Sequence, residues 1–133
     1  MWVKFNIRRN VGLRIRQAQF GFNRLSILDL SKNANQPILS NDKKYLMVFN
    51  GEIYNYKELA DEHLKGVEFR TTSDTEVLLC LYEKYGAECV NLLNGIFAFC
   101  VYDLRQKKAQ LFRDHYGVKP LYYAQGNDYF MFC

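Results

Sequence analysis

The sequence predicts a layered fold of mixed α and β structure, in which two stacked sheets carry helices on their outer faces. Its 133 residues fall in the range of a single domain that can bury a core. The hydrophobic share of 49% and the aromatic share of 16% are too high for a disordered chain and favour strands over a simple helix bundle. Strands that are apolar on both faces combine with one-sided helices most simply in such layers.

Two strands are predicted from apolar runs at residues 45–50 and 96–102. Neighbouring positions are apolar in both runs, so each strand needs cover on both of its faces. Shorter runs, several of them rich in aromatic residues, are joined in places by polar turns such as 126–128, which favours pairing as hairpins. These further strands are expected at 12–16, 19–28, 109–113, 121–124 and 129–132.

Two helices are predicted from capping residues and apolar periodicity. Ser73 and Glu76 have the spacing of a capping box, in which each side chain binds the backbone N–H of the other residue. The other helix is expected at about 56–64, ending at Gly66, which suits a left-handed cap region. A short third helix is expected at 88–93. The apolar stripe of the helix that begins at Ser73 consists of Val77, Leu78, Leu81, Tyr82 and Tyr85.

The charge distribution limits the classes of partner that the chain is expected to bind. Eighteen Lys and Arg residues against fourteen Asp and Glu leave a net charge of +4, and the excess lies largely in the acid-free residues 1–16. Such residues could contact nucleic acid or an anionic membrane, but a solvated edge strand explains them better. No stretch approaches the roughly 20 apolar residues that span a bilayer, and no signal peptide is evident. We expect a cytoplasmic protein that binds neither nucleic acid nor membranes.

The cysteines indicate a reducing compartment and not a metal centre. Cys80, Cys89, Cys100 and Cys133 form no Cys-x-x-Cys pair, and no paired histidines lie near them in the sequence. Buried thiols are therefore expected, and neither a metal nor another cofactor is predicted for these residues.

The first candidate site is Asn50-Gly51-Glu52, directly after a predicted strand. Asn-Gly between apolar runs is typical of a tight hairpin turn, and taken alone this is the favoured interpretation. The alternative is an anion-binding loop, in which the Asn side-chain amide and the Gly backbone N–H both donate toward one oxygen. A second pair, Asn94-Gly95, lies between a predicted helix and a predicted strand and is explained as a cap.

Asp74 and Arg24 are two further candidates, each with a structural alternative. Asp74 falls in the first turn of a predicted helix, where the helix dipole favours an acid, but its carboxylate could also hold a substrate ammonium group. Arg24 lies in an apolar run, where an arginine requires a carboxylate partner from the protein or from a ligand. By spacing alone, these residues indicate no more than a domain with an amino-acid site.

Other polar residues favour structural roles. Arg113-Asp114, followed by Gly117, is interpreted as an ion pair at a tight turn. His63 and His115 are expected at the surface or in turns, and no Ser/His/Asp grouping is evident.

Five segments of the chain carry a longer pattern. They read Asn-Arg-Leu-Ser-Ile-Leu-Asp-Leu at 23–30, Phe-Asn-Gly-Glu-Ile-Tyr-Asn-Tyr at 49–56, Thr-Ser-Asp-Thr-Glu-Val at 72–77, Leu-Asn-Gly-Ile-Phe-Ala-Phe at 93–99 and Arg-Asp-His-Tyr-Gly-Val-Lys-Pro-Leu-Tyr-Tyr at 113–123. In this order they resemble the class II glutamine amidotransferase domain of asparagine synthetases. The resemblance implies an amino-terminal-nucleophile hydrolase fold, a four-layer αββα sandwich of two mainly antiparallel sheets.

The resemblance also implies a reaction and a role for each candidate. In that family, an amino-terminal cysteine attacks the side-chain amide of L-glutamine, and the ammonia passes to an ATP-dependent synthetase domain that makes asparagine. Carried over by motif, Arg24 binds the glutamine α-carboxylate and Asp74 its ammonium group. Glu52 helps to hold the substrate, and Asn50 with Gly51 forms the oxyanion hole. ATP and Mg²⁺ belong to the synthetase domain, and a homodimer of the longer protein is compatible with the resemblance.

The chain departs from the family pattern in several places. Position 2 is Trp2 where the family has its cysteine, and Phe22 stands where a histidine is usual. No cysteine precedes Cys80, so the nucleophile is absent and the chain alone is expected to be inactive.

The segments outside the motifs are shorter than in the family. Only 23 residues precede Arg24, and the chain ends before the Ser-Gly-Gly-Leu-Asp-Ser loop of the synthetase domain. We therefore expect residues 1–133 to form one partial glutamine amidotransferase domain, truncated at both ends, without the synthetase domain. The alternative is a non-catalytic module that binds glutamine or another protein.

Overall fold

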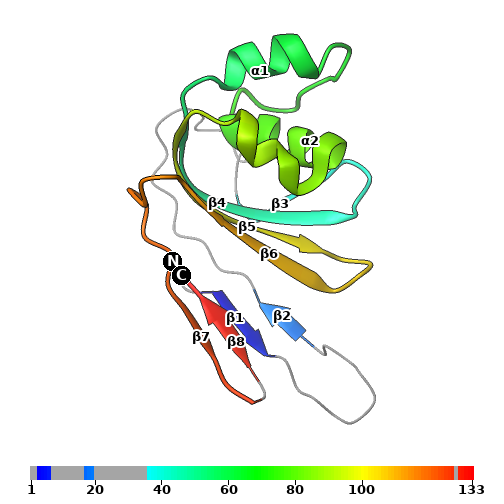
Figure 1. Cartoon of the computed structure of the whole chain (residues 1–133). Helices are drawn as coiled ribbons and strands as arrows, with labels where there is room; N and C mark the ends of the chain where they lie inside the picture. Colours follow the sequence, from blue (N-terminus) through cyan, green and yellow to red (C-terminus); the bar gives the residue numbers. More distant parts are fainter. Residues whose placement is uncertain (1–2, 7–16, 20–35, 128) are drawn as a thin grey trace.

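The computed structural model describes residues 3–6, 17–19, 36–127 and 129–133 (Figure 1). These residues form two four-stranded sheets, two α-helices and one 3-10 helix. The predicted strand at 12–16 and the predicted strand at 19–28, apart from Gln19, lie outside the described residues.

The strands of both sheets pair in antiparallel fashion. The central sheet has the order β3-β4-β5-β6 and the outer sheet has the order β2-β1-β8-β7. The strands of the central sheet are β3 (Ile38–Leu39), β4 (Tyr45–Ile53), β5 (Gly95–Asp103) and β6 (Lys108–Arg113). Those of the outer sheet are β1 (Val3–Asn6), β2 (Gln17–Gln19), β7 (Tyr123–Gln125) and β8 (Phe130–Phe132).

The two predicted central strands are confirmed as β4 and β5, which are neighbours along their whole length. Their register runs from Tyr45 opposite Asp103 to Ile53 opposite Gly95. β6 and β8 confirm the predicted strands at 109–113 and 129–132, while β7 begins two residues later than the predicted 121–124. Hairpins join β5 to β6 and β7 to β8, but β4 and β5 are separated in sequence by the helices.

The predicted helices are confirmed as α1 (Tyr56–His63), α2 (Asp74–Tyr85) and the 3-10 helix η2 (Gly86–Leu92). They lie on one face of the central sheet, and the outer sheet lies on the other (Figure 1). Instead of the predicted one-sided stripe, every residue of α2 from Asp74 to Tyr82 is buried, because α1 packs on its outer side. Tyr85, the last residue of that stripe, is 37% exposed.

Half of the predicted capping box is present at the start of α2. The Ser73 hydroxyl accepts the N–H of Glu76 at 3.3 Å, as expected for an N-cap. The Glu76 carboxylate does not return to Ser73 but accepts hydrogen bonds from Arg70 and Thr71. At the end of α1, Gly66 adopts the predicted left-handed conformation, with a φ of +84°.

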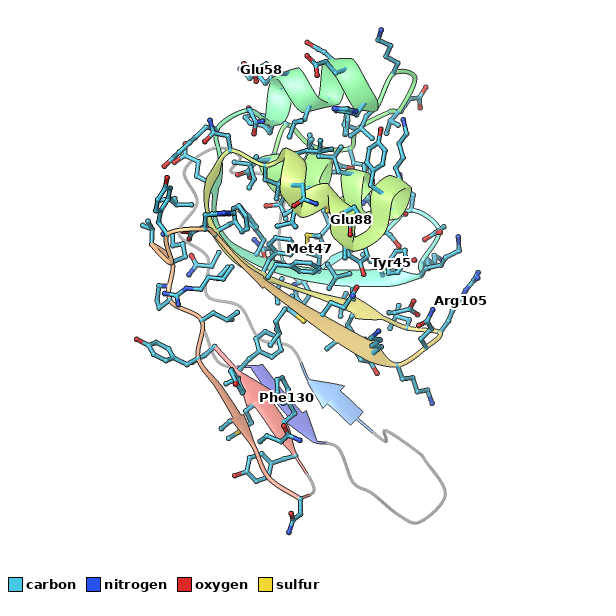
Figure 2. The ribbon with its side chains drawn as sticks, viewed as in Figure 1. Tyr45, Met47, Glu58, Glu88, Arg105 and Phe130 are labelled. Atoms are coloured by element: carbon cyan, nitrogen blue, oxygen red, sulfur yellow. The ribbon has the colours of Figure 1, made fainter. Side chains whose placement is uncertain are left out.

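The alternation of side chains along β4 divides the core into two layers. Met47, Phe49 and Ile53 pack against the helices, and Val48 packs toward the outer sheet with Cys100 and Phe132. Figure 2 shows Met47 in the layer beneath α2 and Phe130 on the outer sheet. The fold is therefore of the α+β class, with one helical layer and two sheets in the described residues. A second helical layer, which the resemblance implies, stays a prediction.

Among the described residues, none of the helices combines the length and the apolar character that crossing a membrane requires.

Candidate functional site

Asn50 and Gly51 lie inside β4 and not in a turn. Asn50 is opposite Ala98 and Gly51 is opposite Phe97 in the unbroken register with β5. The interpretation of this pair as a hairpin turn is therefore wrong. β4 continues without a break to Ile53, which is buried in the layer beneath the helices.

Glycine is required at position 51 by the close approach of β5. Gly51 has a φ of +156°, and a Cβ there would lie 2.1 Å from the Ile96 carbonyl oxygen. Gly95 faces the same restriction from the other strand, since its Cβ would lie 2.2 Å from the Glu52 carbonyl oxygen. The explanation of Gly95 as a helix cap is wrong, because Leu93 caps η2 and Gly95 begins β5. The two glycines bring the two backbones together.

The Asn50 side chain lines a cavity of about 240 Å³. Even-numbered residues of β4 face the outer sheet, so Asn50 follows Val48 on that face. The wall of the cavity is largely apolar, and a carboxamide at its edge can donate to or accept from a bound group. The other lining residues are Ala98, Phe99, Cys100, Pro120, Leu121, Tyr122, Phe132 and Cys133.

Asp74 meets the same end of β4 from the helical side. It is the first residue of α2 and is 5% exposed, and its Oδ2 accepts the N–H of Ile53 at 3.0 Å. Burial raises the pKa of Asp74, and the nearby Glu52 carboxylate adds to this, while the hydrogen bond from Ile53 opposes it. The position at a helix N-terminus favours the acid, as predicted, and also leaves a carboxylate beside residues 50–53.

The structure thus brings Asn50, Gly51, Glu52 and Asp74 to one end of the central sheet. Asn50 and Glu52 are exposed, so both are accessible to a ligand. Arg24, the remaining predicted site residue, and Trp2 and Phe22, which mark departures from the family pattern, lie outside the described residues. Their roles stay predictions.

The loop after β6 forms the other wall of the cavity and is held by two side chains. The Asp114 carboxylate accepts backbone N–H groups of Phe97, Tyr116, Val118 and Lys119. The Arg113 guanidinium donates to the carbonyl oxygens of Gly117 and Lys119. In the described part of the chain, each side chain binds backbone groups and not the other, so the predicted ion pair is wrong although the tight turn is confirmed.

Acid is expected to weaken the fold through Asp114. Burial would raise the pKa of this carboxyl, but the hydrogen bonds from Lys119, Val118, Phe97 and Tyr116 outweigh it and lower the pKa to about 2. The stability that Asp114 contributes is therefore present above its ordinary pKa of 3.8 and is lost as pH falls toward about 2. Urea unfolding should show Asp114→Asn less stable than the wild type at about pH 7, with the gap narrowing toward about pH 2.5. The exposed Asp61→Asn serves as control, and a gap independent of pH would contradict this role.

Three of the four cysteine thiols are held in their protonated form by burial. Cys80, Cys89 and Cys100 are buried, as predicted, and Cys133 is partly buried. Burial raises the pKa of Cys80 to about 11 and the pKa values of Cys89 and Cys100 to about 12. No group of three or more His, Cys, Asp and Glu side chains in the described residues could hold a metal ion.

Two parts of this site were not predicted from the sequence. The Ile53 N–H that binds Asp74 is a backbone group of an apolar residue, and no side-chain pattern signals it. The cavity wall at 120–122 belongs to the loop that Arg113 and Asp114 hold by hydrogen bonds to backbone groups.

Residues 12–133 match the family model described as the glutamine amidotransferase domain. The chain belongs to this family.

Curated proteins similar to the chain carry asparagine synthetase names. Asparagine synthetase [glutamine-hydrolyzing] 1 of Bacillus subtilis (strain 168) is 47% identical over 115 residues, which are 86% of this chain and 18% of that protein. Asparagine synthetase [glutamine-hydrolyzing] 3 of Arabidopsis thaliana is 46% identical over 105 residues, 79% of this chain and 18% of that protein. A putative asparagine synthetase [glutamine-hydrolyzing] 2 of Methanocaldococcus jannaschii is 42% identical over 128 residues, 84% of this chain and 24% of that protein. The chain therefore spans less than a quarter of the length of these relatives.

Proposed function

We propose that the chain is the glutamine-binding part of an asparagine synthetase, in which ammonia from glutamine serves the ATP-dependent amidation of aspartate. The observation that carries the proposal is the hydrogen bond from the Ile53 N–H to Asp74, which places this carboxylate at the end of β4 where Asn50, Gly51 and Glu52 also lie. An amino acid with an amide side chain has an α-ammonium group that a carboxylate can bind and a side-chain carbonyl that an amide or a backbone N–H can bind.

Each candidate has a part in this proposal. The Asp74 carboxylate accepts the α-ammonium group, and Arg24 binds the α-carboxylate through its two-pronged guanidinium. The Asn50 amide and the Gly51 N–H stabilise the oxyanion that develops from the side-chain carbonyl, and Glu52 helps to hold the substrate. The covalent step needs a thiolate with a base beside it, which this role assigns to an amino-terminal cysteine of the longer protein.

The remainder of the proposal concerns the longer protein. Its domain would have the four-layer αββα sandwich of amino-terminal-nucleophile hydrolases, with the second helical layer on the outer sheet. A carboxy-terminal synthetase domain would bind ATP and Mg²⁺ and receive the ammonia. We place the protein in the cytoplasm.

Glutamine affinity tests the site directly. Isothermal titration of the folded chain should show Asp74→Asn binding glutamine about tenfold more weakly or worse, because a charged hydrogen bond contributes roughly 1.5 to 3 kcal/mol. Arg24→Ala should lose more affinity than Arg24→Lys, since lysine keeps the charge but not the bidentate geometry. Asp61→Asn removes the same charge from an exposed position on α1 and should leave the affinity unchanged.

Two outcomes would contradict the assignment. Unchanged affinity in both Arg24→Ala and Asp74→Asn would remove the reason for placing glutamine here. Affinity should also fall in acid as Asp74 is protonated, with a midpoint above 3.8 because burial raises its pKa. Affinity that does not change on acidification of a folded chain would exclude Asp74 as the ammonium partner.

A further inference from the structure

Glu76 carries a buried carboxylate that the proposed chemistry does not use. Its side chain is 1% exposed. Its Oε1 accepts the N–H and the Nε of Arg70, both at 3.1 Å, and its Oε2 accepts the N–H and the hydroxyl of Thr71, both at 2.7 Å. Burial acts to raise the pKa of Glu76, but these hydrogen bonds outweigh it and hold the pKa below its ordinary value. The ionised Glu76 therefore clamps residues 70 and 71.

The hydrogen bonds continue in a ring that encloses Ser73. Because the Thr71 hydroxyl gives its hydrogen to Glu76, it can only accept from Ser73, whose N–H lies at 3.2 Å and whose hydroxyl lies at 2.9 Å. The Ser73 oxygen in turn accepts the N–H of Glu76. Both the backbone and the side chain of Ser73 are fixed in this way, and Asp74 is the next residue.

The arrangement does more than cap α2. The Ser73 hydroxyl alone is an adequate N-cap, and a complete capping box would direct Glu76 to the Ser73 N–H. Glu76 reaches past it to the preceding loop, and the Arg70 guanidinium also donates to the Leu39 carbonyl oxygen of β3 at 3.0 Å. The loop before Asp74 is thereby bound to β3, the edge strand of the central sheet. β3 is the neighbour of β4, which contains Asn50 and Gly51.

We propose that Glu76 is a positioning residue that holds Asp74 where it receives the α-ammonium group of glutamine. This inference rests on the proposed function. Asp74 is fixed on one side by the Ile53 N–H and on the other by the ring through Ser73. Loss of the clamp lets Ser73 and Asp74 move, and a carboxylate displaced by about 1 Å no longer forms a good hydrogen bond with an ammonium group.

The test compares two ligands by isothermal titration of the 133-residue chain. One is L-glutamine, and the other is glutaramate, which is glutamine without its α-amino group and so has nothing for Asp74 to bind. Glu76→Gln places an amide nitrogen, which cannot accept, against the donors of residues 70 and 71. We expect it to weaken glutamine binding roughly three- to tenfold while leaving glutaramate binding unchanged. A general loss of structure would weaken both ligands equally.

Further variants separate positioning from stability. Thr71→Val removes the hydroxyl of the ring and should reproduce the selective loss, and Thr71→Ser should restore the wild-type affinity. Leu59→Ala, in the buried face of α1, destabilises the fold without touching the ring and should leave both affinities unchanged where the protein is folded. Thr71→Val also replaces Glu76→Gln if the latter does not fold.

The double variant Asp74→Asn/Glu76→Gln decides how Glu76 acts. If Glu76 acts through Asp74, the double variant binds glutamine no more weakly than Asp74→Asn alone. Additive losses, or equal losses for both ligands, would overturn the positioning role while leaving the proposed function in place. If Asp74→Asn also binds normally, or the wild type binds neither ligand, the proposed function itself fails and the inference fails with it.

Discussion

Replacing Gly51 with alanine is expected to lower the free energy of unfolding by roughly 2–5 kcal/mol, which is a large share of the stability of a small domain. Two costs combine at this position. The φ of +156° is one that L side chains rarely adopt, and the new Cβ would lie 2.1 Å from the Ile96 oxygen and 2.7 Å from the Phe97 Cα. These are backbone atoms of the central strand β5, so relief requires the pairing of β4 with β5 to open. Urea unfolding measures the loss, and glutamine binding should disappear with it.

Other glycines of the chain separate the two costs. Gly86 has a φ of +60° and a ψ of −143°, and a Cβ added there would have nothing within 4 Å, so Gly86→Ala carries the conformational cost alone, roughly 1–3 kcal/mol. Gly95 has the steric restriction without an unusual φ, since its Cβ would lie 2.2 Å from the Glu52 oxygen. We expect Gly86→Ala to be the least destabilising of the three, Gly95→Ala more so and Gly51→Ala the most. Equal stability of Gly51→Ala and Gly86→Ala would mean that the strands do not approach as closely as the structure shows.

Gly51 illustrates why the sequence alone misplaced its segment. Asn-Gly after an apolar run has the local chemistry of a turn, and the partner that overrules it is β5, more than 40 residues later in the chain. A glycine that is needed because another backbone passes close by looks the same in sequence as a glycine needed for a turn. The apolar runs of β4 and β5 were predictable because a strand that is covered on both faces needs apolar residues at consecutive positions.

The candidate site was predictable in its residue types and less so in its geometry. Asn50 stood out because Asn-Gly follows a buried strand, and Asp74 stood out as an acid in the first turn of a predicted helix. The position of Asp74 at the end of β4 depends on a hydrogen bond from the backbone of Ile53, which carries no sequence signal. Glu76 shows the same limit, because its spacing from Ser73 matches a capping box although its carboxylate binds the preceding loop.

A polypeptide of these 133 residues is expected to release no glutamate from glutamine above a buffer control. Hydrolysis through a thioester requires a thiolate, and with a pKa of about 12 only roughly one Cys89 or Cys100 thiol in ten thousand is ionised at about pH 8. Cys80, with a pKa of about 11, is similarly unreactive and lies within the buried part of α2. Asn50 and Gly51 can lower the energy of an oxyanion but cannot form one without a nucleophile. A coupled assay measures the glutamate released, and a thiol titration of the native chain measures how many cysteines are reactive.

Cys133 is the thiol that tests this expectation most severely. It is only partly buried and lines the same cavity as Asn50, so it is the cysteine best placed to meet a bound amide. Cys133 lacks the neighbouring base that the reaction also requires. Its α-nitrogen lies in the peptide bond after Phe132 and donates its hydrogen to the Tyr122 carbonyl, so it cannot accept a proton. We therefore expect Cys133 to react with a thiol reagent faster than Cys80, Cys89 and Cys100, and still to give no glutamate. Glutamate release that the wild type shows and Cys133→Ser lacks would identify it as a nucleophile and overturn the requirement for an amino-terminal cysteine.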